Sequence, residues 1–570
     1  MSRLRLSFLA LATLAVLTLL PGCAQVMNQV GGVAARMLTQ STDDLSKSNR
    51  MISYIDNAYP SATGEAGVVA VGGKHQEGQP TASVTLMKRS GIGLWKLTGD
   101  MTANGTPMDS YAGGVSRFLF LEDRSPVTVG ITSESGQSEE YRLNPLPPIR
   151  ITAINGQPVG RTMEDAVALD LEGPLTLDID RQGGGMATDM RIALMGTTMG
   201  VKGFWDVAVV PGQNRIALPA GVFSNGQGNP INTGDNWLLV EEYERPTFEE
   251  ARNGGMLLKV VKSADAVPVI TSGDLPRNAV GLIRGGFTVE EEARSQGDDR
   301  FAYSFTKPPA FSGPAFLPGT KLALVTFTVR ANDLSQERTS TSTRDDYATN
   351  TRTTTTTTRT RQFAQLPTAF YQQLANDMHG DLMGAMQSAW NVEMIPISQV
   401  LASPRYQRYE AVQDTATAQY ASASYGGLST IFDPSPFAVL KAGDTSGPFS
   451  MAQQERLMDE LGVDGLVAVT IDLSMPWDEF SLTPMVNLQI IGRTADLMQP
   501  AQSFYAKGTV TGEGQDMENV DMDDPAQLRA FLDNAINRTL LATTFRVGFE
   551  RLVQEERANH PIYSAVWEGR

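Results

Sequence analysis

Hydrophobic and polar positions divide the chain into three stretches of different texture. Residues 6–20 form an almost continuous apolar run. Between about 61 and 320, short apolar or alternating runs are separated by Gly, Asn, Asp and Pro, which is typical of β-sandwich or small-barrel modules. From 321 to 562, helical periodicity alternates with strand-like runs. The pattern predicts a multidomain protein with N-terminal all-β modules and a C-terminal α/β domain with a mixed sheet.

The all-β stretch is long enough for two modules of ordinary domain size. The Pro-rich segment 143–148 is the best candidate for a boundary, because Pro interrupts strand pairing. We therefore expect one β module over 61–148 and a second over 149–320. A short tail, 563–570, is expected after the α/β domain.

Residues 149–183 allow two interpretations. The strand ending in Ile154-Asn155-Gly156, a short helix around Met163–Leu171 and a strand running into Arg181 resemble the second half of a PDZ domain. That resemblance implies binding of extended peptides by strand addition. Asn155-Gly156 taken alone predicts only a tight β-hairpin. Both interpretations are compatible with the sequence.

The α/β domain is predicted to open with a buried strand at Lys321–Val329. A helix is predicted over 367–390, where apolar residues recur at intervals of four. A second helix, 451–461, ends at Gly462, and a third runs from about Pro525 to Glu556. Residues 391–401 are predicted to form a strand and turn, and 463–475, 483–493 and 503–512 are predicted to form three strands.

Three parts of this domain carry a resemblance to known proteins: Leu324–Phe327, the helix at 370–388 and the segment LMDELGVDGLVAVTIDLSM at 457–475. They resemble the α/β domain of bacterial envelope lipoproteins. These include the curli-secretion channel lipoprotein, the penicillin-binding-protein activator lipoproteins and the N-terminal domain of the Tol-Pal propeller protein. The resemblance implies an accessory role in an envelope machine.

The segment 338–361 interrupts the α/β pattern. It contains twelve Thr and five Arg, with Tyr347 and Ala348 as its least polar residues. Such a composition is typical of low-complexity, disordered segments, whereas β-branched Thr favours extended structure. A long polar hairpin that pairs with another protomer or partner and a disordered insert are both compatible with the sequence.

The N-terminus carries a targeting signal. Arg3 and Arg5 precede the apolar run, and Leu20-Pro21-Gly22-Cys23 ends it, which describes a secretory signal rather than a membrane span. This ending resembles a bacterial lipobox, which implies removal of residues 1–22 and lipidation of Cys23, for example with palmitate. An ordinary secretory signal and an uncleaved anchor are the alternatives. By the same resemblance, Ala24 implies sorting to the outer membrane, with the body facing the periplasm.

Residues 23–60 are predicted to form a lipid-anchored tether that becomes a helix, because part of their apolar spacing is helical and Ser41 or Thr42 can cap it. Cys23 is the only cysteine, so neither a disulfide framework nor a second, catalytic thiol is available. The net charge of −17 argues against nucleic-acid partners and against electrostatic docking on anionic lipid.

No catalytic, cofactor-binding or metal-ligating residue is expected. The three histidines, His75, His379 and His560, are far apart in sequence. Asp377, His379 and Asp381 superficially suggest a metal site on a helix, but Asp377 and Asp381 share a helix face while His379 points elsewhere, so a solvated surface is expected instead. Asp521–Asp524 starts like a calcium loop but lacks its later Gly and Glu, so a charged helix N-terminus explains it better. Five aromatic residues in 402–450 either line a partner-binding loop or anchor that loop to the sheet: Tyr406, Tyr409, Tyr420, Tyr425 and Phe432.

The expected function is therefore that of a non-enzymatic lipoprotein at the outer membrane. It would act as a scaffold or accessory factor in envelope assembly, secretion or cell-wall synthesis, through a partner protein and possible homo-oligomers. A polysaccharide-binding or hydrolysing lipoprotein and a PDZ-type peptide-binding lipoprotein are the alternatives.

Overall fold

Strands predominate in the first half of the chain, and the longer helices follow residue 367. The computed structural model describes residues 39–57, 79–89, 93–111, 116–181, 188–198, 201–223, 227–228, 231–245, 247–273, 287–291, 301–307, 316–332, 336–346, 351–361, 367–408, 420–428, 452–474, 481–493, 504–517, 520–521 and 524–559.

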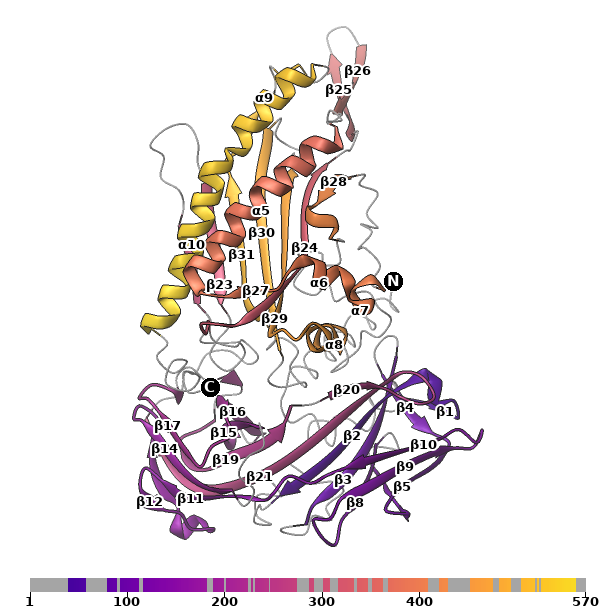
Figure 1. Cartoon of the computed structure of the whole chain (residues 1–570), viewed down its shortest axis with the longest axis vertical. Helices are drawn as coiled ribbons and strands as arrows, with labels where there is room; N and C mark the ends of the chain where they lie inside the picture. The colour runs from indigo at the N-terminus through magenta and orange to yellow at the C-terminus, as the bar shows by residue number, and fades with distance from the viewer. Residues whose placement is uncertain are drawn as a thin grey trace.

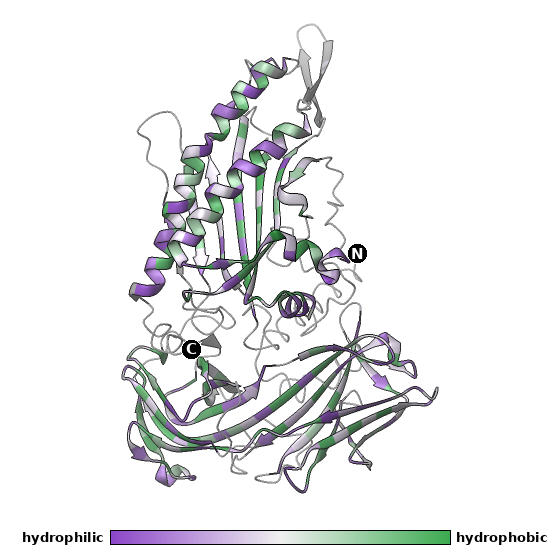
Figure 2. Cartoon of the chain, in the orientation of Figure 1, coloured by the Kyte–Doolittle hydropathy of each residue, from purple (hydrophilic) through white to green (hydrophobic). Residues whose placement is uncertain are grey.

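The described elements form a wide β base, an α/β domain standing on it and a β-hairpin at the far end (Figure 1). Figure 2 shows hydrophobic and hydrophilic residues alternating along many of the base strands. This alternation is expected where successive side chains point to opposite faces of a sheet.

One long strand holds the base together. β21 (Met256–Ser272) has 17 residues, which at about 3.3 Å per residue extend over roughly 55 Å. Its first half pairs with β20 (Thr247–Glu250) on one edge and parallel to β2 (Ser48–Asn57) on the other. Its second half pairs with β19 (Gly234–Glu244) and parallel to β13 (Val167–Asp170). The strand therefore belongs to two sandwiches in succession.

The first sandwich packs the first half of β21 and its neighbours over a four-stranded sheet. Its core includes Ile52 and Tyr54 of β2 and Leu257 of β21, all fully buried. The remaining strands on the β21 side are β1 (Thr39–Thr42), β3 (Thr81–Lys88), β4 (Leu94–Leu97), β7 (Asp109–Tyr111) and β8 (Ser116–Phe120). The opposing sheet has the order β10 (Ser138–Leu143), β9 (Val127–Ser133), β5 (Gly99–Ala103) and β6 (Thr106–Pro107).

The second sandwich is built in the same way around the second half of β21. Its core includes Trp205, whose indole N–H donates to the carbonyl of Phe223 at 2.7 Å. The β21 side continues through β19 to β15 (Thr188–Thr198), β16 (Val201–Pro211) and β18 (Gln227–Gly228). The opposing sheet has the order β12 (Gln157–Pro158), β11 (Ile149–Ile154), β14 (Leu175–Arg181) and β17 (Arg215–Leu218).

Polar side chains of β21 fix the point where the chain enters the second sandwich. Ser263 accepts the backbone N–H of Ile149 at 3.2 Å, and buried Asp265 accepts that of Ile151 at 2.7 Å. Arg161 donates to both carboxylate oxygens of Asp265 at 2.6 and 2.8 Å. The backbone N–H groups at the start of β11 are thereby hydrogen-bonded to β21. β11 directly follows the Pro-rich segment 143–148.

The two opposing sheets contain the same turn. Asn104-Gly105 between β5 and β6 and Asn155-Gly156 between β11 and β12 have positive φ at both central residues, as a type I′ hairpin requires. Each Asn backbone donates to a Thr carbonyl at 2.8 Å, and its side-chain oxygen accepts the N–H of the same Thr. These partners are Thr128 of β9 and Thr176 of β14. The base therefore contains a structural duplication.

The helix expected within residues 23–60 is wrong for the described part. Residues 39–57 form β1, a 3-10 turn at Leu45–Lys47 and β2. Ile52 and Tyr54 alternate into the core, and Asp44 caps the short turn by accepting the N–H of Ser46 at 3.0 Å. Cys23 and residues 58–78 lie outside the described residues.

The PDZ-like helix is also wrong, because only Met163–Asp165 form a 3-10 turn and the chain continues as β13. The hairpin interpretation of Asn155-Gly156 is confirmed. β22 (Phe287–Glu291) and β23 (Phe301–Lys307), expected in the second β module, belong instead to the sheet of the α/β domain. Phe305 of β23 explains the difference, because it packs edge-on against Phe545 and Phe549 of the last helix.

The α/β domain has a mixed sheet, as expected. Its order is β22, β23, β31 (Phe504–Gly512), β30 (Ser481–Gly492), β29 (Gly465–Ser474), β24 (Lys321–Asn332) and β27 (Glu393–Met394). β28 (Tyr420–Ser424) also pairs with β24, and β32 (Gln515–Asp516) pairs with β30. β24 and β29 run parallel, whereas β29, β30, β31 and β23 run antiparallel in succession.

The predicted helices are confirmed, with one break. α5 (Thr368–Trp390) buries its apolar stripe, and α8 (Ala452–Leu461) ends at Gly462 in the left-handed region. The expected single C-terminal helix is α9 (Pro525–Ile536) and α10 (Arg538–Asn559), separated by Asn537 with φ of 37°. The short helices are α6 (Ile397–Ala402) and α7 (Pro404–Gln407). In Figure 1, α5 and α10 lie side by side over one face of the sheet.

The Thr-rich insert forms a hairpin. β25 (Gln336–Asp346) and β26 (Thr351–Arg361) pair antiparallel over eleven positions, from Gln336 opposite Arg361 to Asp346 opposite Thr351. The hairpin projects from the end of the α/β domain that is farthest from the base (Figure 1).

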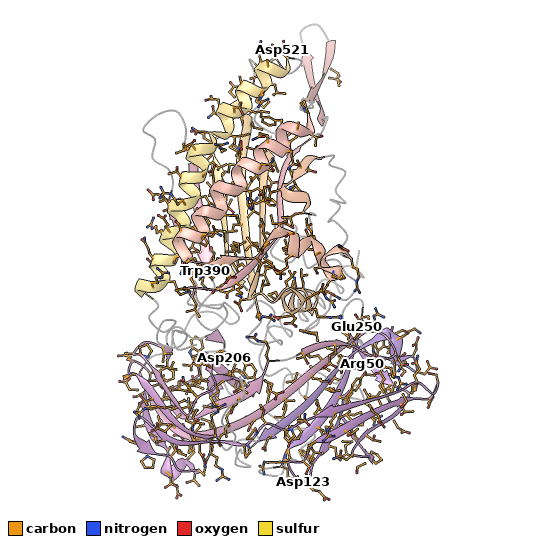
Figure 3. The ribbon with its side chains drawn as sticks, in the orientation of Figure 1. Arg50, Asp123, Asp206, Glu250, Trp390 and Asp521 are labelled. Atoms are coloured by element: carbon orange, nitrogen blue, oxygen red, sulfur yellow. The ribbon has the colours of Figure 1, made fainter. Side chains whose placement is uncertain are left out.

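The α/β domain contacts the base through α8. Arg456 donates to Glu250 of β20 at 2.8 Å and approaches the sulfur of Met256 at 3.4 Å. The hydrogen bond from Arg456 lowers the pKa of Glu250. Figure 3 shows Glu250 on the upper side of the base, facing this domain.

A buried ion pair links the two sheets of the first sandwich. Arg50 of β2 donates to both carboxylate oxygens of Glu139 in β10 at 2.9 Å, and both side chains are fully buried. Arg50 also donates to the carbonyls of Ser48 and Gly254. Glu139 further accepts from the hydroxyl of Tyr141 at 2.6 Å. Neither charge is left uncompensated.

Replacement of Glu139 by Gln should lower the free energy of unfolding by about 3–5 kcal/mol, because it leaves the buried guanidinium without its counter-charge. Chemical unfolding measured by tryptophan fluorescence tests this. Glu140→Gln, at the exposed neighbouring position, is the matched control. The double variant Arg50→Met/Glu139→Leu should recover most of the loss. Equal effects of Glu139→Gln and Glu140→Gln would contradict this assignment.

Candidate functional site

The sheet of the α/β domain has one apolar and one polar face. Residues under the helices are apolar, as Phe327 shows by its edge contact with His379 of α5 at 5.4 Å. Strand alternation places the neighbouring residues on the opposite face. That face, called here the polar face, consists of Ser304 and Thr306 (β23), Lys507, Thr509 and Thr511 (β31), Asn487 and Gln489 (β30), Thr470 and Asp472 (β29), and Thr326, Thr328 and Arg330 (β24).

A hydrogen-bond network crosses the polar face. Arg330 donates to Asp472 at 2.6 Å, and the side-chain amide of Asn487 donates to the same carboxylate at 2.9 Å. Thr470 also donates to Asp472, at 3.3 Å, and Thr509 donates to Asn487 at 3.4 Å. The network connects four strands and fixes the positions of its polar groups.

Exposure on the polar face changes from strand to strand. Ser304 and Lys507 are exposed, whereas Thr326 and Thr470 are buried. Gln489 is 7 % exposed, and its side-chain oxygen has no hydrogen-bond partner among the described residues. A buried, unpaired acceptor carries a desolvation cost of about 1–3 kcal/mol. The Gln489 side-chain oxygen is therefore a buried acceptor that stays unsatisfied within the described residues of the polar face.

A second charged cluster lies on the second sandwich, on the face of its large sheet opposite the core. Arg191 of β15 donates to Asp206 of β16 at 2.7 Å and to Glu241 of β19 at 2.6 Å. The ammonium of Lys262 in β21 lies 3.7 Å from Glu241. Burial raises the pKa of Glu241, but attraction to Lys262 and Arg191 outweighs it and lowers that pKa to about 2. Figure 3 marks Asp206 in this sandwich. Mutually paired charges of this kind fix strands in place.

A third buried charge lies at the end of β23. The ammonium of Lys307 is 3.3 Å from the carboxylate of Glu556 in α10 and 4.9 Å from the ring centroid of Phe316. Glu556 also accepts the backbone N–H of Phe316 at 2.8 Å. Burial lowers the pKa of Lys307, and Glu556 opposes this shift. The pair connects the end of α10 to the sheet.

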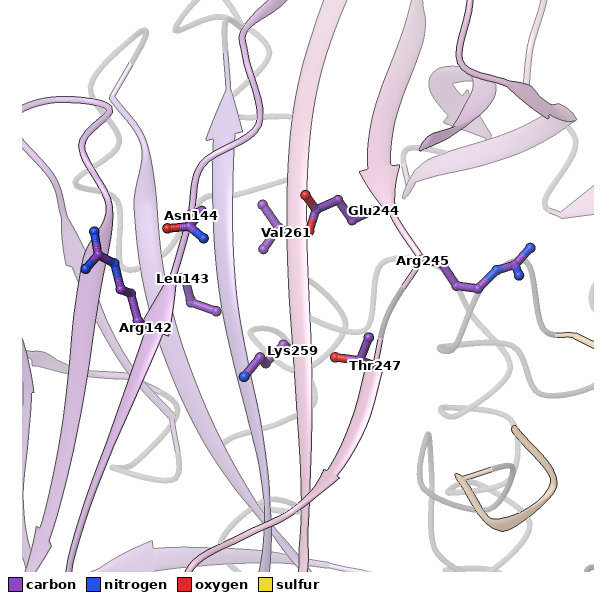
Figure 4. A pocket seen from close by; sticks show the side chains of 8 residues that line it. All are labelled: Arg142, Leu143, Asn144, Glu244, Arg245, Thr247, Lys259 and Val261. Carbon is purple, nitrogen blue, oxygen red and sulfur yellow. The ribbon is translucent and has the colours of Figure 1, made fainter. Parts of the chain in front are cut away.

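A small cavity of about 190 Å³ lies beside β21 in the base (Figure 4). Its lining combines cationic, acidic and apolar residues: Arg142, Leu143, Asn144, Glu244, Arg245, Thr247, Lys259 and Val261. Lys259 already pairs with Glu249 at 2.7 Å. Burial raises the pKa of Glu244. Pockets for drug-sized ligands usually measure about 300–1,000 Å³, so this cavity suits at most a small group.

The expected surface position of His379 is wrong. Its ring is half-buried and stacks on Tyr425 with centroids 3.7 Å apart, and burial lowers its pKa. Asp377 and Asp381 do share a helix face, as expected, and together they pair with Arg538 of α10 at 2.7 and 3.5 Å. His75 and His560 lie outside the described residues, among which no group of three potential metal ligands occurs.

Other expected residues have structural roles where they are described. Asp524 caps α9 by accepting the N–H of Ala526 at 2.9 Å, so the helix-terminus interpretation of Asp521–Asp524 is confirmed. Tyr406 donates to the carbonyl of Val325 in β24 at 2.8 Å and anchors its segment to the sheet. Tyr409 and Phe432 lie outside the described residues, as does Cys23.

The sequence contains a signal for the polar face that its motifs do not reveal. Every second position is polar in VTFTVR, and two of the three alternating positions are polar in VAVTID and in MVNLQI. Such alternation is typical of a strand with one buried and one polar face. Strand assignment alone does not indicate that the polar residues of several strands will meet on one side.

Comparisons with known proteins identify no family for the chain. No family model and no curated protein matches it. A solved structure of fibronectin(III)-like modules of Clostridium thermocellum CbhA is similar at 8% identity over 34% of this chain and 86% of that chain, with a TM-score of 0.12. So low a TM-score supports no inference about fold or function. None of the described helices is both long and apolar enough to cross a membrane.

The charged cluster on the second sandwich predicts a specific acid sensitivity. Glu241 has a lower pKa in the folded protein than the ordinary value of 4.5. Its stabilising effect is therefore complete above pH 4.5 and is lost as the pH falls towards 2. A shift of this size corresponds to about 3 kcal/mol. Unfolding measured from pH 6 to 2 should show this loss.

Glu241→Gln should be less stable than the wild type at neutral pH and should lose less stability between about pH 4.5 and 2. Adding Lys262→Gln should restore part of the neutral-pH stability without restoring the acid sensitivity. Parallel pH profiles for wild type and Glu241→Gln would show that this carboxylate does not hold the sandwich together.

Proposed function

We propose that the chain is a non-enzymatic, lipid-anchored scaffold of the bacterial envelope, attached to the outer membrane through Cys23 and facing the periplasm. The order of its parts along the molecule carries this proposal. β1, the first described strand, lies in the base, whereas the Thr-rich hairpin lies at the opposite end (Figure 1). An anchor at Cys23 would place the base next to the membrane and the hairpin away from it.

The connection between anchor and base limits how far the body can stand from the bilayer. Fifteen residues separate Cys23 from Thr39, so the two positions lie at most about 55 Å apart when the connection is fully extended. Two sandwiches joined through β21 would act as a stiff spacer. The α/β domain and its hairpin would then contact partners in the periplasm.

The polar face is the surface that we assign to a protein partner in an envelope assembly, secretion or cell-wall machine. Its network between Arg330 and Asp472 holds polar groups in fixed positions, which favours specific hydrogen bonding. Ser304 and Lys507 are exposed on it. Partner recognition by preorganised polar groups loses less conformational entropy than recognition by flexible side chains.

A polysaccharide is the second candidate partner. The exposed side chains of Ser304 and Lys507 lie on the same face as Asp472, and hydroxyl and ammonium groups can bond to sugar hydroxyls. Sedimentation of the protein with insoluble cell-wall glycan would support this candidate over a protein partner. Release of reducing sugar during that assay would indicate a hydrolase.

Anchoring is tested by Cys23→Ser. The wild type should incorporate palmitate and fractionate with membranes of a diderm host, whereas Cys23→Ser should lose both properties because the thioether cannot form. Gln25→Ser, two residues further along, is the matched control and should behave like wild type. Membrane retention of Cys23→Ser without label would contradict lipid anchoring.

Partner binding is tested in the same cells by a photo-crosslinking residue at Lys507. It should give a discrete adduct with one envelope protein, and the adduct should weaken in Cys23→Ser, which is no longer held at the membrane. The same residue at the exposed Gln554 of α10 is the control position. Identical adduct patterns from both positions would contradict a role of the polar face.

A further inference from the structure

The hairpin presents two strand edges whose backbone groups have no partner strand in the described part of the chain. β25 and β26 form a separate two-stranded sheet and pair only with each other there. An unpaired strand edge readily adds another strand, unless charges oppose it. The distribution of charged residues along each strand therefore decides which edge can be extended, and by what.

We propose that the edge of β26 pairs with β26 of a second copy of this chain, antiparallel and two-fold symmetric about Thr356. This inference deepens the proposed function and rests on it for its setting, because it assigns one partner of the scaffold. β26 has eleven residues. A register centred on its sixth residue pairs all of them: Thr351 lies opposite Arg361 of the other copy, and Thr354 lies opposite Thr358.

Charge placement favours this register. Arg352 lies opposite Thr360 of the other copy, Arg359 opposite Thr353 and Arg361 opposite Thr351. No arginine faces another arginine, and all remaining positions pair Thr with Thr. Threonine pairs across neighbouring strands are favourable, whereas like charges directly opposite each other are unfavourable.

The same arginines oppose the neighbouring registers. A shift by one residue in one direction places Arg352 opposite Arg359, and a shift in the other direction places it opposite Arg361. Parallel pairing in register places every arginine opposite its own copy. The three arginines therefore oppose both one-residue shifts, whereas a shift by two residues brings no arginines together but leaves two residues of each β26 strand unpaired.

β25 lacks this self-complementarity. In the register that pairs all eleven of its residues, Arg338 would lie opposite Arg344, and Glu337 opposite Asp345. Pairing of β25 with β26 of another copy in the register of the hairpin would again place Arg338 opposite Arg359. The β26 edge is thus the one suited to a second copy.

Anchoring of both copies to the membrane would strengthen the polar contact between their β26 strands. Eleven backbone pairs without an apolar face give a modest association in solution. Confinement of both copies to one membrane raises their effective concentration and favours pairing without any new contact. Exposed positions at Thr354 and Thr356 leave room for the added strand.

Single cysteines test the register, because the full chain contains only Cys23. In a Cys23→Ser background, Thr356→Cys should form a disulfide-linked dimer under mild oxidation. Residues directly opposite in an antiparallel pair lie about 4.5–5.5 Å apart at their Cα atoms, within disulfide range. Thr354→Cys is the matched control and should not cross-link to itself, because its copies would be about 13 Å apart. A mixture of Thr354→Cys and Thr358→Cys chains should cross-link.

Thr360→Arg provides an independent variant. It places an arginine opposite Arg352 of the other copy but opposite Glu337 within its own hairpin. It should preserve the hairpin and reduce cross-linking through Thr356→Cys, corresponding to roughly two- to thirtyfold weaker pairing. Equal cross-linking by Thr354→Cys and Thr356→Cys would overturn the proposed register.

Two other outcomes also overturn the proposal. Cross-linking between Thr341→Cys and Thr356→Cys chains, without a Thr356→Cys homodimer, would show that β25 pairs with β26 of a neighbour. Absence of any Thr356→Cys dimer, both in solution and in membranes of cells carrying the Cys23 chain, would exclude pairing through this edge. The cross-linking experiment in the Cys23→Ser background does not depend on lipidation. A failure of anchoring would therefore leave its result unchanged, whereas a failure of pairing would abolish the Thr356→Cys dimer.

Discussion

The pairing of β21 is the constraint on which the rest of the structure depends. Each sandwich needs this strand to complete its larger sheet, and the first sandwich also needs β2, which runs parallel beside it. Parallel strands require a long connection, and here the chain builds the entire second sandwich up to β19 before β21 returns. Neither half of the base has a complete sheet without the other.

Paired charges, most of them buried, reinforce this arrangement at positions where an apolar contact would not specify a partner. Asp265 accepts the backbone N–H of Ile151 near the start of β11. Arg50 and Glu139 join the two sheets of the first sandwich, and Arg456 of the α/β domain donates to Glu250 of the base. Each group has a defined hydrogen-bond partner in a neighbouring element. These pairs hold neighbouring elements of the base in fixed positions, which the proposed role as a spacer requires.

Local patterns predicted the elements that local forces determine. The four-residue spacing of α5, the stop at Gly462 and the Asn155-Gly156 turn all occur as expected. The helix predicted before residue 60 fails because its apolar positions are selected by strands more than 200 residues away. Sequence periodicity does not indicate which strand pairs with which. It therefore cannot assign β23 to the α/β sheet or show that both sandwiches share β21.

The same limit applies to the polar face. Polar residues at alternating positions mark each strand, but only the register of β24, β29, β30 and β31 brings them together. Hydrogen exchange followed by mass spectrometry tests the central role of β21 most directly. With increasing denaturant, amides of β9 and β15, one from each sandwich, should become exposed together with the same free energy of opening. Exposure of β15 at lower denaturant, while β9 stays protected, would show that the two sandwiches are independent units.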